Sequence, residues 1–489
     1  MRFLKSPEIS DYNDYETITL IGNALETKKK YAIKTLTKPE ADLMKSFSDL
    51  YQQRTPLSKS LIERSKRVMP GGISHNVHYF PPYPFFIKSA KGSKIWDVDG
   101  NEYIDLWMGH YTHILGHHPQ VIIEAIERQL KEGLHWGIVF EKQVEWAELI
   151  QQLVPSAEMV RFCCSGTEAT MYAVRLARAY TGKKIILKIA GGWHGANPDL
   201  SVGIKMPYER EESLGLFPEL IRYTKTIPFN DIQETLQIIH QNREDLAGII
   251  LEPVVGEGGF FPPTKDYLNM LRSETERLGA LLIFDEVISG FRVALGGAQE
   301  RFGIIPDLTT LGKVAGGGFP VGVLVGKREI LERTSPERKG KKWEKILIGG
   351  GTFSSHPFSA AAGLAMLHYL CDYEDEVYPL LESRGVKIRK DLQEVFNNER
   401  VDAIVTGIGS LFQIHFPFEK HTVLDSPHAV NQKTDIEKRE VEFRLRMLNH
   451  GVHVMHGGGG LSIAHSEEDI TRIIDAARDT AKEMKEGNY

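Results

Sequence analysis

Three short segments of this sequence carry residue types that could bind and activate a small molecule. In the first, Lys313 follows the apolar residues 308–311 and precedes a run of glycines at 316–318. A lysine withdrawn from water at a strand end has a lowered pKa and can act as an amine nucleophile in Schiff-base chemistry. Taken alone, a surface lysine is the simpler interpretation. The glycine run also lacks the G-x-G-x-x-G spacing of a dinucleotide-binding turn.

The second segment places a carboxylate after four apolar residues. Asp285 follows Leu281–Phe284, which has the pattern of a buried strand. Ligands bind at the carboxyl ends of strands in open α/β sheets. A carboxylate buried there needs a cationic or hydrogen-bonding partner. Considered by itself, Asp285 could equally cap a following helix.

The third segment is Ser165-Gly166-Thr167, between an apolar strand pattern and a helical pattern that starts at Ala169. Hydroxyl groups and free backbone N–H groups at a helix N-terminus form an anion site. By itself, Ser165 could be an ordinary helix cap, and no GxxxxGK[ST] motif supports a P-loop. A phosphate cradle, a buried carboxylate and a buried lysine, each at a strand end, together describe a site for pyridoxal phosphate.

Several longer motifs also resemble a known family. The segments SGTEA, GGWHG, EPVVGEGG, LLIFDEVISGFR, GKVAGGGFPVG and GTFSSHP resemble class III aminotransferases of pyridoxal phosphate fold type I. The order and spacing match from about residue 64 to the end. Within the class, the glutamate-1-semialdehyde 2,1-aminomutase subgroup and its aminotransferase relatives are the most similar.

The resemblance implies a role for each matching residue. Lys313 forms the Schiff base with the cofactor and then acts as general acid and base, and Asp285 bonds the pyridine N–H. Thr352 reaches the phosphate of a partner subunit, which implies a homodimer or a multiple of it. The other implied cofactor contacts are the phosphate ligands Ser165, Gly166 and Thr167, the ring-stacking residues Val287 and Trp193, and the ring neighbours His194 and Glu252.

Two departures from the aminomutase pattern bear on the substrate. His78 stands where the aminomutases have an arginine that grips the substrate carboxylate, and neutral imidazole cannot form that bidentate bond. The stretch Gly457–Gly460 lacks the usual acid, and we expect it to leave space or mobility beside the substrate. Arg292 is a candidate replacement cation, with a purely structural role as the alternative, and Glu257 replaces a common asparagine.

Six histidines lie within 44 positions of one another, at 75, 78, 110, 113, 117 and 118. No HExxH motif accompanies them, and turn signals surround them. We therefore expect no metal site. These residues are interpreted as solvated or packed histidines, or as part of the lining of the active site.

The pattern of elements indicates how these groups are positioned. Apolar strands alternate with helical windows after residue 119, which predicts a mostly parallel α/β sheet covered on both faces. The resemblance implies seven strands in this sheet. A hairpin turn at Asp99-Gly100-Asn101 and a charged C-terminal part suggest one smaller α+β domain built from both ends. The expected divisions are an extension at 1–55, small-domain segments at 56–118 and 376–489, and the large domain at 119–375.

Composition excludes several classes of protein. The net charge of −6 over 489 residues gives no basic footprint for nucleic acid or membrane surfaces. Three cysteines exclude a disulfide framework, and no apolar run is long enough to span a bilayer. We therefore expect a cytoplasmic protein without nucleic-acid or membrane partners.

The expected activity is transfer of an amino group from an amine or amino acid to a carbonyl compound by ping-pong steps. The main alternative is an aminomutase, which moves the amine within one molecule. A racemase or decarboxylase on the same scaffold and a non-catalytic paralogue stay open as further alternatives.

Overall fold

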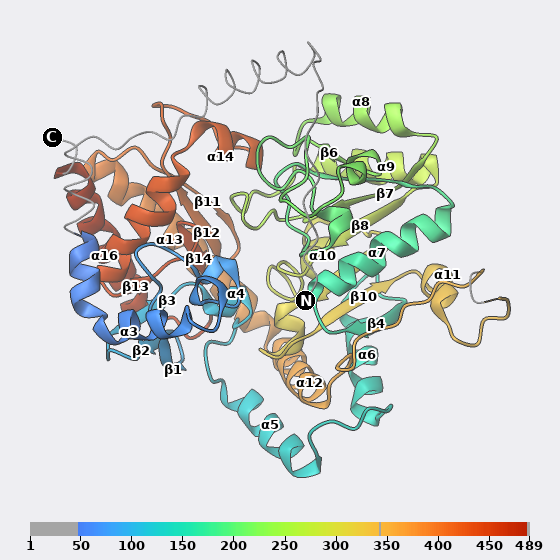
Figure 1. Ribbon diagram of the computed structural model, residues 1–489, viewed down its shortest axis with the longest axis horizontal. Coiled ribbons are helices and arrows are strands. Elements are labelled where there is room, and N and C mark those ends of the chain that lie inside the picture. Colours follow the sequence, from blue (N-terminus) through green and yellow to red (C-terminus); the bar gives the residue numbers. More distant parts are fainter. Residues whose placement is uncertain (1–46, 342–343, 487–489) are drawn as a thin grey trace, which may run out of the picture. The chain divides into compact units, whose positions relative to one another are not determined.

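The computed structural model describes residues 47–341 and 344–486, and its largest element is a seven-stranded sheet (Figure 1). The strands run in the order β4-β10-β9-β8-β7-β5-β6. Only β10 is antiparallel to its neighbours β4 and β9. The remaining pairs from β9 to β6 are parallel. The strand bounds are Met159–Cys163 (β4), Ile185–Ile189 (β5), Thr224–Ile227 (β6), Leu246–Leu251 (β7), Leu281–Asp285 (β8), Leu308–Gly312 (β9) and Gly322–Gly326 (β10).

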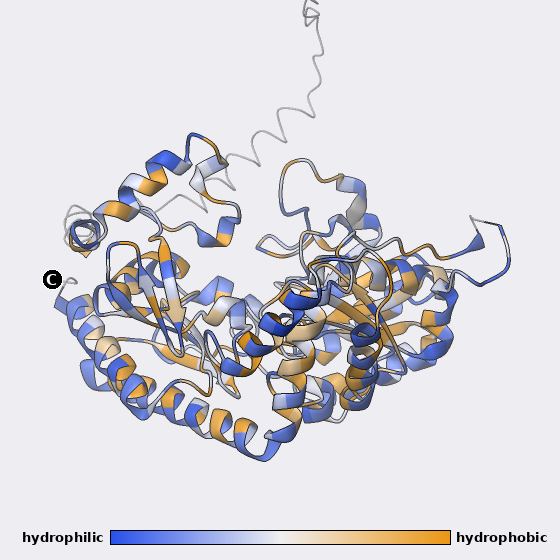
Figure 2. Cartoon of the chain, turned by 90° about the horizontal axis from the view of Figure 1, so that it is seen from below, coloured by the Kyte–Doolittle hydropathy of each residue, from blue (hydrophilic) through white to orange (hydrophobic). Residues whose placement is uncertain are grey.

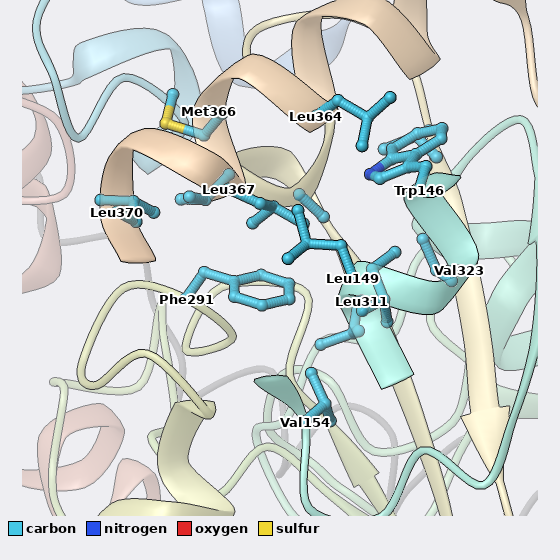
Figure 3. Packing of buried hydrophobic residues seen from close by; sticks show 14 of the residues in the cluster. Trp146, Leu149, Val154, Phe291, Leu311, Val323, Leu364, Met366, Leu367 and Leu370 are labelled. Atoms are coloured by element: carbon cyan, nitrogen blue, oxygen red, sulfur yellow. The ribbon is translucent and has the colours of Figure 1, made fainter. Parts of the chain in front are cut away.

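Helices cover both faces of this sheet. Side chains alternate along a strand, so Val323 and Val325 of β10 pack against Trp146 and Leu367, whereas Leu324 joins the cluster that contains α7. Figure 3 shows the first of these clusters, and Figure 2 shows hydrophobic colour along the strands and mixed colour on the helices. The helices that pack around the sheet are α5 (Gln120–Glu132), α6 (Glu141–Leu153), α7 (Gly166–Thr181), α8 (Ile232–Asn242), α9 (Lys265–Leu278), α10 (Gly297–Phe302) and α12 (Pro357–Asp372).

The N-terminal hairpin and the C-terminal part of the chain share one sheet and one core. Val452 pairs in parallel with Ile104, which joins β13 to β3. The hydrophobic cluster around Phe412 contains residues from both ends of the chain. The elements are β1 (Ile87–Lys91), β2 (Lys94–Asp97), β3 (Glu102–Asp105), α13 (Glu374–Glu399), β11 (Ile404–Ile408), β12 (Leu411–His415), α14 (Pro427–Lys433), α15 (Arg444–Asn449), β13 (Val452–His453), β14 (Gly458–Gly460) and α16 (Glu467–Glu486). The expected fold class, a mostly parallel seven-stranded sheet with a smaller α+β part, is confirmed.

Some local expectations differ from the structure. Residues 47–54, at the end of the expected extension, are helical, and Tyr51 is buried with its hydroxyl donating to the carbonyl of Tyr83. The strand β6 was not expected, because its sequence TKTI is too polar for an apolar run. A π-helical stretch over Lys438–Phe443 leads directly into α15. Residues 1–46 lie outside the described residues.

In the part of the chain that the structure describes, no helix is both long and apolar enough to cross a membrane.

Candidate active site

Two neighbouring parallel strands bring the expected lysine and carboxylate to the same edge of the sheet. Asp285 is the last residue of β8 and lies in register with Thr310 of β9, three positions before Lys313. Lys313 begins a short 3₁₀ turn with a left-handed φ of 46°. Burial lowers the pKa of Lys313, although the carboxylates of Asp285, Glu252 and Glu257 oppose this effect. A lysine with a lowered pKa is the amine nucleophile that the sequence predicts.

The carboxylate of Asp285 is held on both of its oxygens. The hydroxyl of Thr310 donates to Oδ1 at 2.8 Å, and the backbone N–H of Val287 donates to the same atom at 3.2 Å. His194 Nδ1 lies 2.8 Å from Oδ2. Burial lowers the pKa of His194, and Asp285 opposes the change. The other ring nitrogen of His194 is buried without a hydrogen-bond partner among the described residues, which leaves a polar atom free to face a bound group.

The buried side chain of Lys188 fixes the loop that carries Trp193 and His194. Lys188 Nζ donates to the carbonyls of Gly192, Leu200 and Val202 at 2.8, 3.1 and 2.9 Å. The loop follows β5, and these three hydrogen bonds tie it back to that strand. Burial lowers the pKa of Lys188 to about 7.

Glu252 holds the same loop from the end of β7. Its Oε1 accepts a hydrogen bond from the backbone N–H of Trp193 at 2.8 Å, and its Oε2 accepts from Gly256 at 3.1 Å. Burial, reinforced by the charge of Asp285, raises the pKa of Glu252 to about 8. Hydrogen bonds from Lys188 and to Glu252 therefore hold the loop that carries Trp193 and His194.

The expected phosphate cradle lies at the start of α7. Ser165 caps this helix by accepting a hydrogen bond from the N–H of Glu168 at 3.3 Å. Ala196 N–H donates to Thr167 Oγ1 at 3.3 Å. Gly195 has a φ of 80°, and a Cβ there would lie 2.2 Å from Thr167 Oγ1, so no larger residue fits. The helix N-terminus, two hydroxyls and a tightly packed glycine suit a phosphate group.

Not every predicted site residue lies in this centre. Thr352 is exposed, and it lines a separate cavity of about 250 Å³ together with Trp136 and Ser355. Its contact with a partner subunit stays a prediction. Val287 lies beside Gly166, whose Cβ would be 3.0 Å from the valine side chain.

At the substrate end of the pocket, the structure gives Arg292 a structural role and contradicts the expected looseness of the glycine stretch. Arg292 is fully buried, and its two terminal nitrogens donate to the carbonyls of Tyr111 and Leu461, both at 3.0 Å, so the guanidinium braces the backbone. The glycine stretch is not loose, because residues 458–460 form β14, paired with β12. A Cβ on Gly459 would lie 2.2 Å from the carbonyl oxygen of Leu106.

The six histidines separate into different environments. His117 pairs with Asp105 at 2.7 Å, His113 packs against it with ring centroids 4.8 Å apart, and His118 is exposed. The other three, His75, His78 and His110, gather around one point. Burial, followed by the charge of Lys313, lowers the pKa of His110 to about 3. His110 therefore lies near Lys313.

A cavity of about 440 Å³ adjoins the histidines. Its walls include Phe80, Phe85 and Trp107, and His78 and Arg444 also line it. The guanidinium of Arg444 lies over the ring of Phe80, 3.9 Å from its centroid. The cavity is thus mainly apolar, with an aromatic wall, and the buried Arg444 and the buried Asp105 both line it.

The site contains residues that the sequence did not single out. Lys188 could have been noticed as a charge inside the apolar strand pattern IILKI. Thr310 gave no such signal, because only the pairing of β8 with β9 places its hydroxyl against Asp285.

Comparisons with known proteins agree with this geometry. Residues 75–463 match the family model described as aminotransferase class-III. A protein of Methanosarcina acetivorans named glutamate-1-semialdehyde 2,1-aminomutase is 42% identical over 426 residues, which cover 86% of this chain and 97% of that protein. An omega-transaminase structure from Sphaerobacter thermophilus is 32% identical with a TM-score of 0.81, covering 88% of this chain and 98% of that one.

A solved transaminase with pyridoxal phosphate bound is 31% identical with a TM-score of 0.80, covering 89% of this chain and 99% of that chain. The residues present here fit the same cofactor: a phosphate cradle at the start of α7, the free nitrogen of buried His194, and Lys313 facing Asp285. The chain belongs to the class III aminotransferase family, the pyridoxal phosphate enzymes of fold type I.

Proposed function

We propose that this enzyme transfers an amino group between two molecules, an amine or amino acid donor and a carbonyl acceptor. The observation that carries the proposal is the placement of Lys313 and Asp285 by adjacent parallel strands, with Thr310 and His194 fixing the carboxylate. Bound pyridoxal phosphate supplies an electron sink for negative charge at the carbon that bears the amine.

The residues of this chain have separate tasks in that reaction. Lys313 Nζ would hold the cofactor, and its free amine would move a proton to and from the carbon that bears the amino group. Asp285 would bind the pyridine nitrogen of the cofactor, and the hydrogen bonds from Thr310 and from the N–H of Val287 orient its carboxylate. Glu252 and Lys188 orient the loop of Trp193 and His194.

Transfer between molecules is favoured by the substrate end of the site. His78 replaces the arginine of the aminomutase pattern, and Arg292 does not take over, because it is committed to backbone carbonyls. The neighbouring aromatic cavity of about 440 Å³ suits an amine with an apolar arm. Similarity to an omega-transaminase structure supports the same choice.

The second candidate is intramolecular transfer, as in an aminomutase. Relatives with that name are about 40% identical and match nearly their whole length, for example 97% of the Methanosarcina acetivorans protein. This candidate requires another group to bind the substrate carboxylate.

The test compares two half-reactions of the purified holoenzyme. Aromatic and aliphatic amines are added singly, and loss of the yellow absorbance of the bound cofactor is followed. Glutamate-1-semialdehyde is tested in parallel for conversion to 5-aminolevulinate. We expect an aryl amine to bleach the cofactor and a carbonyl acceptor to restore its colour. Efficient conversion of glutamate-1-semialdehyde, with no response to the amines, would establish the second candidate instead.

A further inference from the structure

Three histidines from two segments of the chain converge beside the catalytic centre. One ring nitrogen of each of His75, His78 and His110 lies within 4.8 Å of the other two. The Nε2 atoms of His78 and His110 are 3.4 Å apart. The ring centroids are separated by 5.3, 5.5 and 5.6 Å, and each pair meets edge to face. The three rings therefore surround one point almost evenly.

The separation of the His78 and His110 nitrogens matches that of two imidazoles around one tetrahedral metal ion. Zinc binds histidine nitrogen at about 2.0–2.1 Å. Two such nitrogens at a tetrahedral angle lie about 3.4 Å apart, which is the separation of the His78 and His110 nitrogens. His75 and His78 are exposed and His110 is half-buried, so a modest rotation of His75 can complete the set.

The three histidines differ from the paired histidines of this protein. His117 and His453 each bond Asp105, and His194 bonds Asp285. Across residues 47–341 and 344–486, no carboxylate forms an ion pair with any of the three converging rings. A group of imidazoles without carboxylate partners offers several free nitrogen lone pairs, which is the donor set that zinc, cobalt and nickel ions accept.

The backbone that carries His110 is strained in a way that directs its ring. Residues 108–111 are all left-handed, with φ values of 45°, 59°, 59° and 65°. The left-handed conformation is unfavourable for every residue with a Cβ, and three of these four residues have one. Asp105 fixes the start of the turn by accepting hydrogen bonds from the N–H groups of Trp107 and Met108 at 2.9 and 3.0 Å. Such strain is concentrated at functional sites.

We propose that His75, His78 and His110 bind one divalent transition-metal ion of the zinc type. Three protein ligands leave a fourth position open, as in catalytic zinc sites. Building on the proposed amine transfer, we further propose that this position takes a carboxylate oxygen of the substrate. His78 lines the aromatic cavity, so a ligand in that cavity reaches the metal. The ion thereby restores a cation where the aminomutase pattern has an arginine.

The first experiment measures metal binding to the full-length holoenzyme. Bound metal is removed with dipicolinate, and the protein is dialysed against Zn²⁺ or Co²⁺. We expect one equivalent per chain and the intense visible bands of four-coordinate Co²⁺. His78→Ala and His110→Ala should each weaken binding by more than the ~10–100-fold that loss of an outer-shell partner costs. His240→Ala is the control, because this exposed histidine lies on α8 beside Glu274.

Retained cofactor absorbance shows that each variant is folded. Failure of the wild type to bind stoichiometric metal would overturn the metal site, as would equal binding by the variants and the wild type.

The second experiment tests the role of the ion without requiring turnover. Calorimetry measures the affinity of the holoenzyme for 3-phenylpropanoate and for the uncharged 3-phenylpropanamide, with and without Zn²⁺. We expect Zn²⁺ to strengthen binding of the acid at least tenfold and to leave the amide unchanged. Equal effects on both ligands would overturn the carboxylate role while the metal site stands. Failure of the proposed amine transfer has a different signature, since no amine would then bleach the cofactor in any variant.

Discussion

Replacement of Lys188 by methionine should loosen the loop that carries Trp193 and His194. The ammonium group donates to three buried carbonyls, at Gly192, Leu200 and Val202. A hydrogen bond from a charged donor contributes about 1.5–3 kcal/mol, so the three together contribute about 4.5–9 kcal/mol. Several kcal/mol of this hydrogen-bond contribution offsets the cost of burying the charged Lys188 side chain. We expect the net loss in the free energy of loop opening to be about 2–4 kcal/mol.

Hydrogen exchange of the amides at 191–202 measures this loss directly. A loss of about 2–4 kcal/mol corresponds to exchange roughly 30- to 1000-fold faster. The holoenzyme is studied at pH 6, where Lys188 is protonated because its pKa is about 7. Lys184→Met is the matched control, since Lys184 lies just before the same strand and is exposed. Unchanged protection in Lys188→Met would refute the argument that this lysine holds the loop.

Four other outcomes are expected. Borohydride should fix the pyridoxyl group on Lys313, and peptide mapping that finds it on another lysine would exclude the site. Asp285→Asn should lower kcat by about 10²–10³-fold or more, as for loss of a group that stabilises transition-state charge, and steady-state kinetics with near-normal turnover would contradict this role. Gly459→Ala should unfold or strongly destabilise the protein, because the new Cβ would lie 2.2 Å from the carbonyl of Leu106; a thermal melt like that of the wild type would show otherwise. Burial lowers the pKa of Lys188 from 10.5 to about 7, so between these pH values the unfolded chain keeps a proton that the folded chain releases. The stability of the wild type relative to Lys188→Met should therefore rise from about pH 7 to about pH 10. Denaturation midpoints of the two proteins with parallel pH profiles would contradict the shift.

The sequence predicted the parts of the site that depend on local pattern. Asp285 and Lys313 each follow an apolar run, and Ser165 stands between a strand pattern and a helical one. Strand ends of this kind meet at one edge of a parallel sheet, so their proximity follows from the fold class. These placements need no knowledge of how distant segments pack.

Other parts of the site depend on contacts between segments far apart in the chain. The hydroxyl of Thr310 meets Asp285 only through the register of two strands. His110 joins His75 and His78 through a left-handed turn that no sequence rule indicates for these residues. Arg292 looked free in the sequence, yet its guanidinium is used inside the protein to satisfy two carbonyls.

The three glycines of β14 leave no room for larger side chains, which restricts the substitutions that this strand can accept. Each of its residues lies where an added carbon would approach within 2.5 Å of a neighbour: Phe412, Leu106 or Arg292. Libraries that randomise 458–460 will therefore return mainly glycine. Selection for new substrates has to act on other residues, such as Phe80, Phe85 and Trp107, whose side chains line the neighbouring cavity.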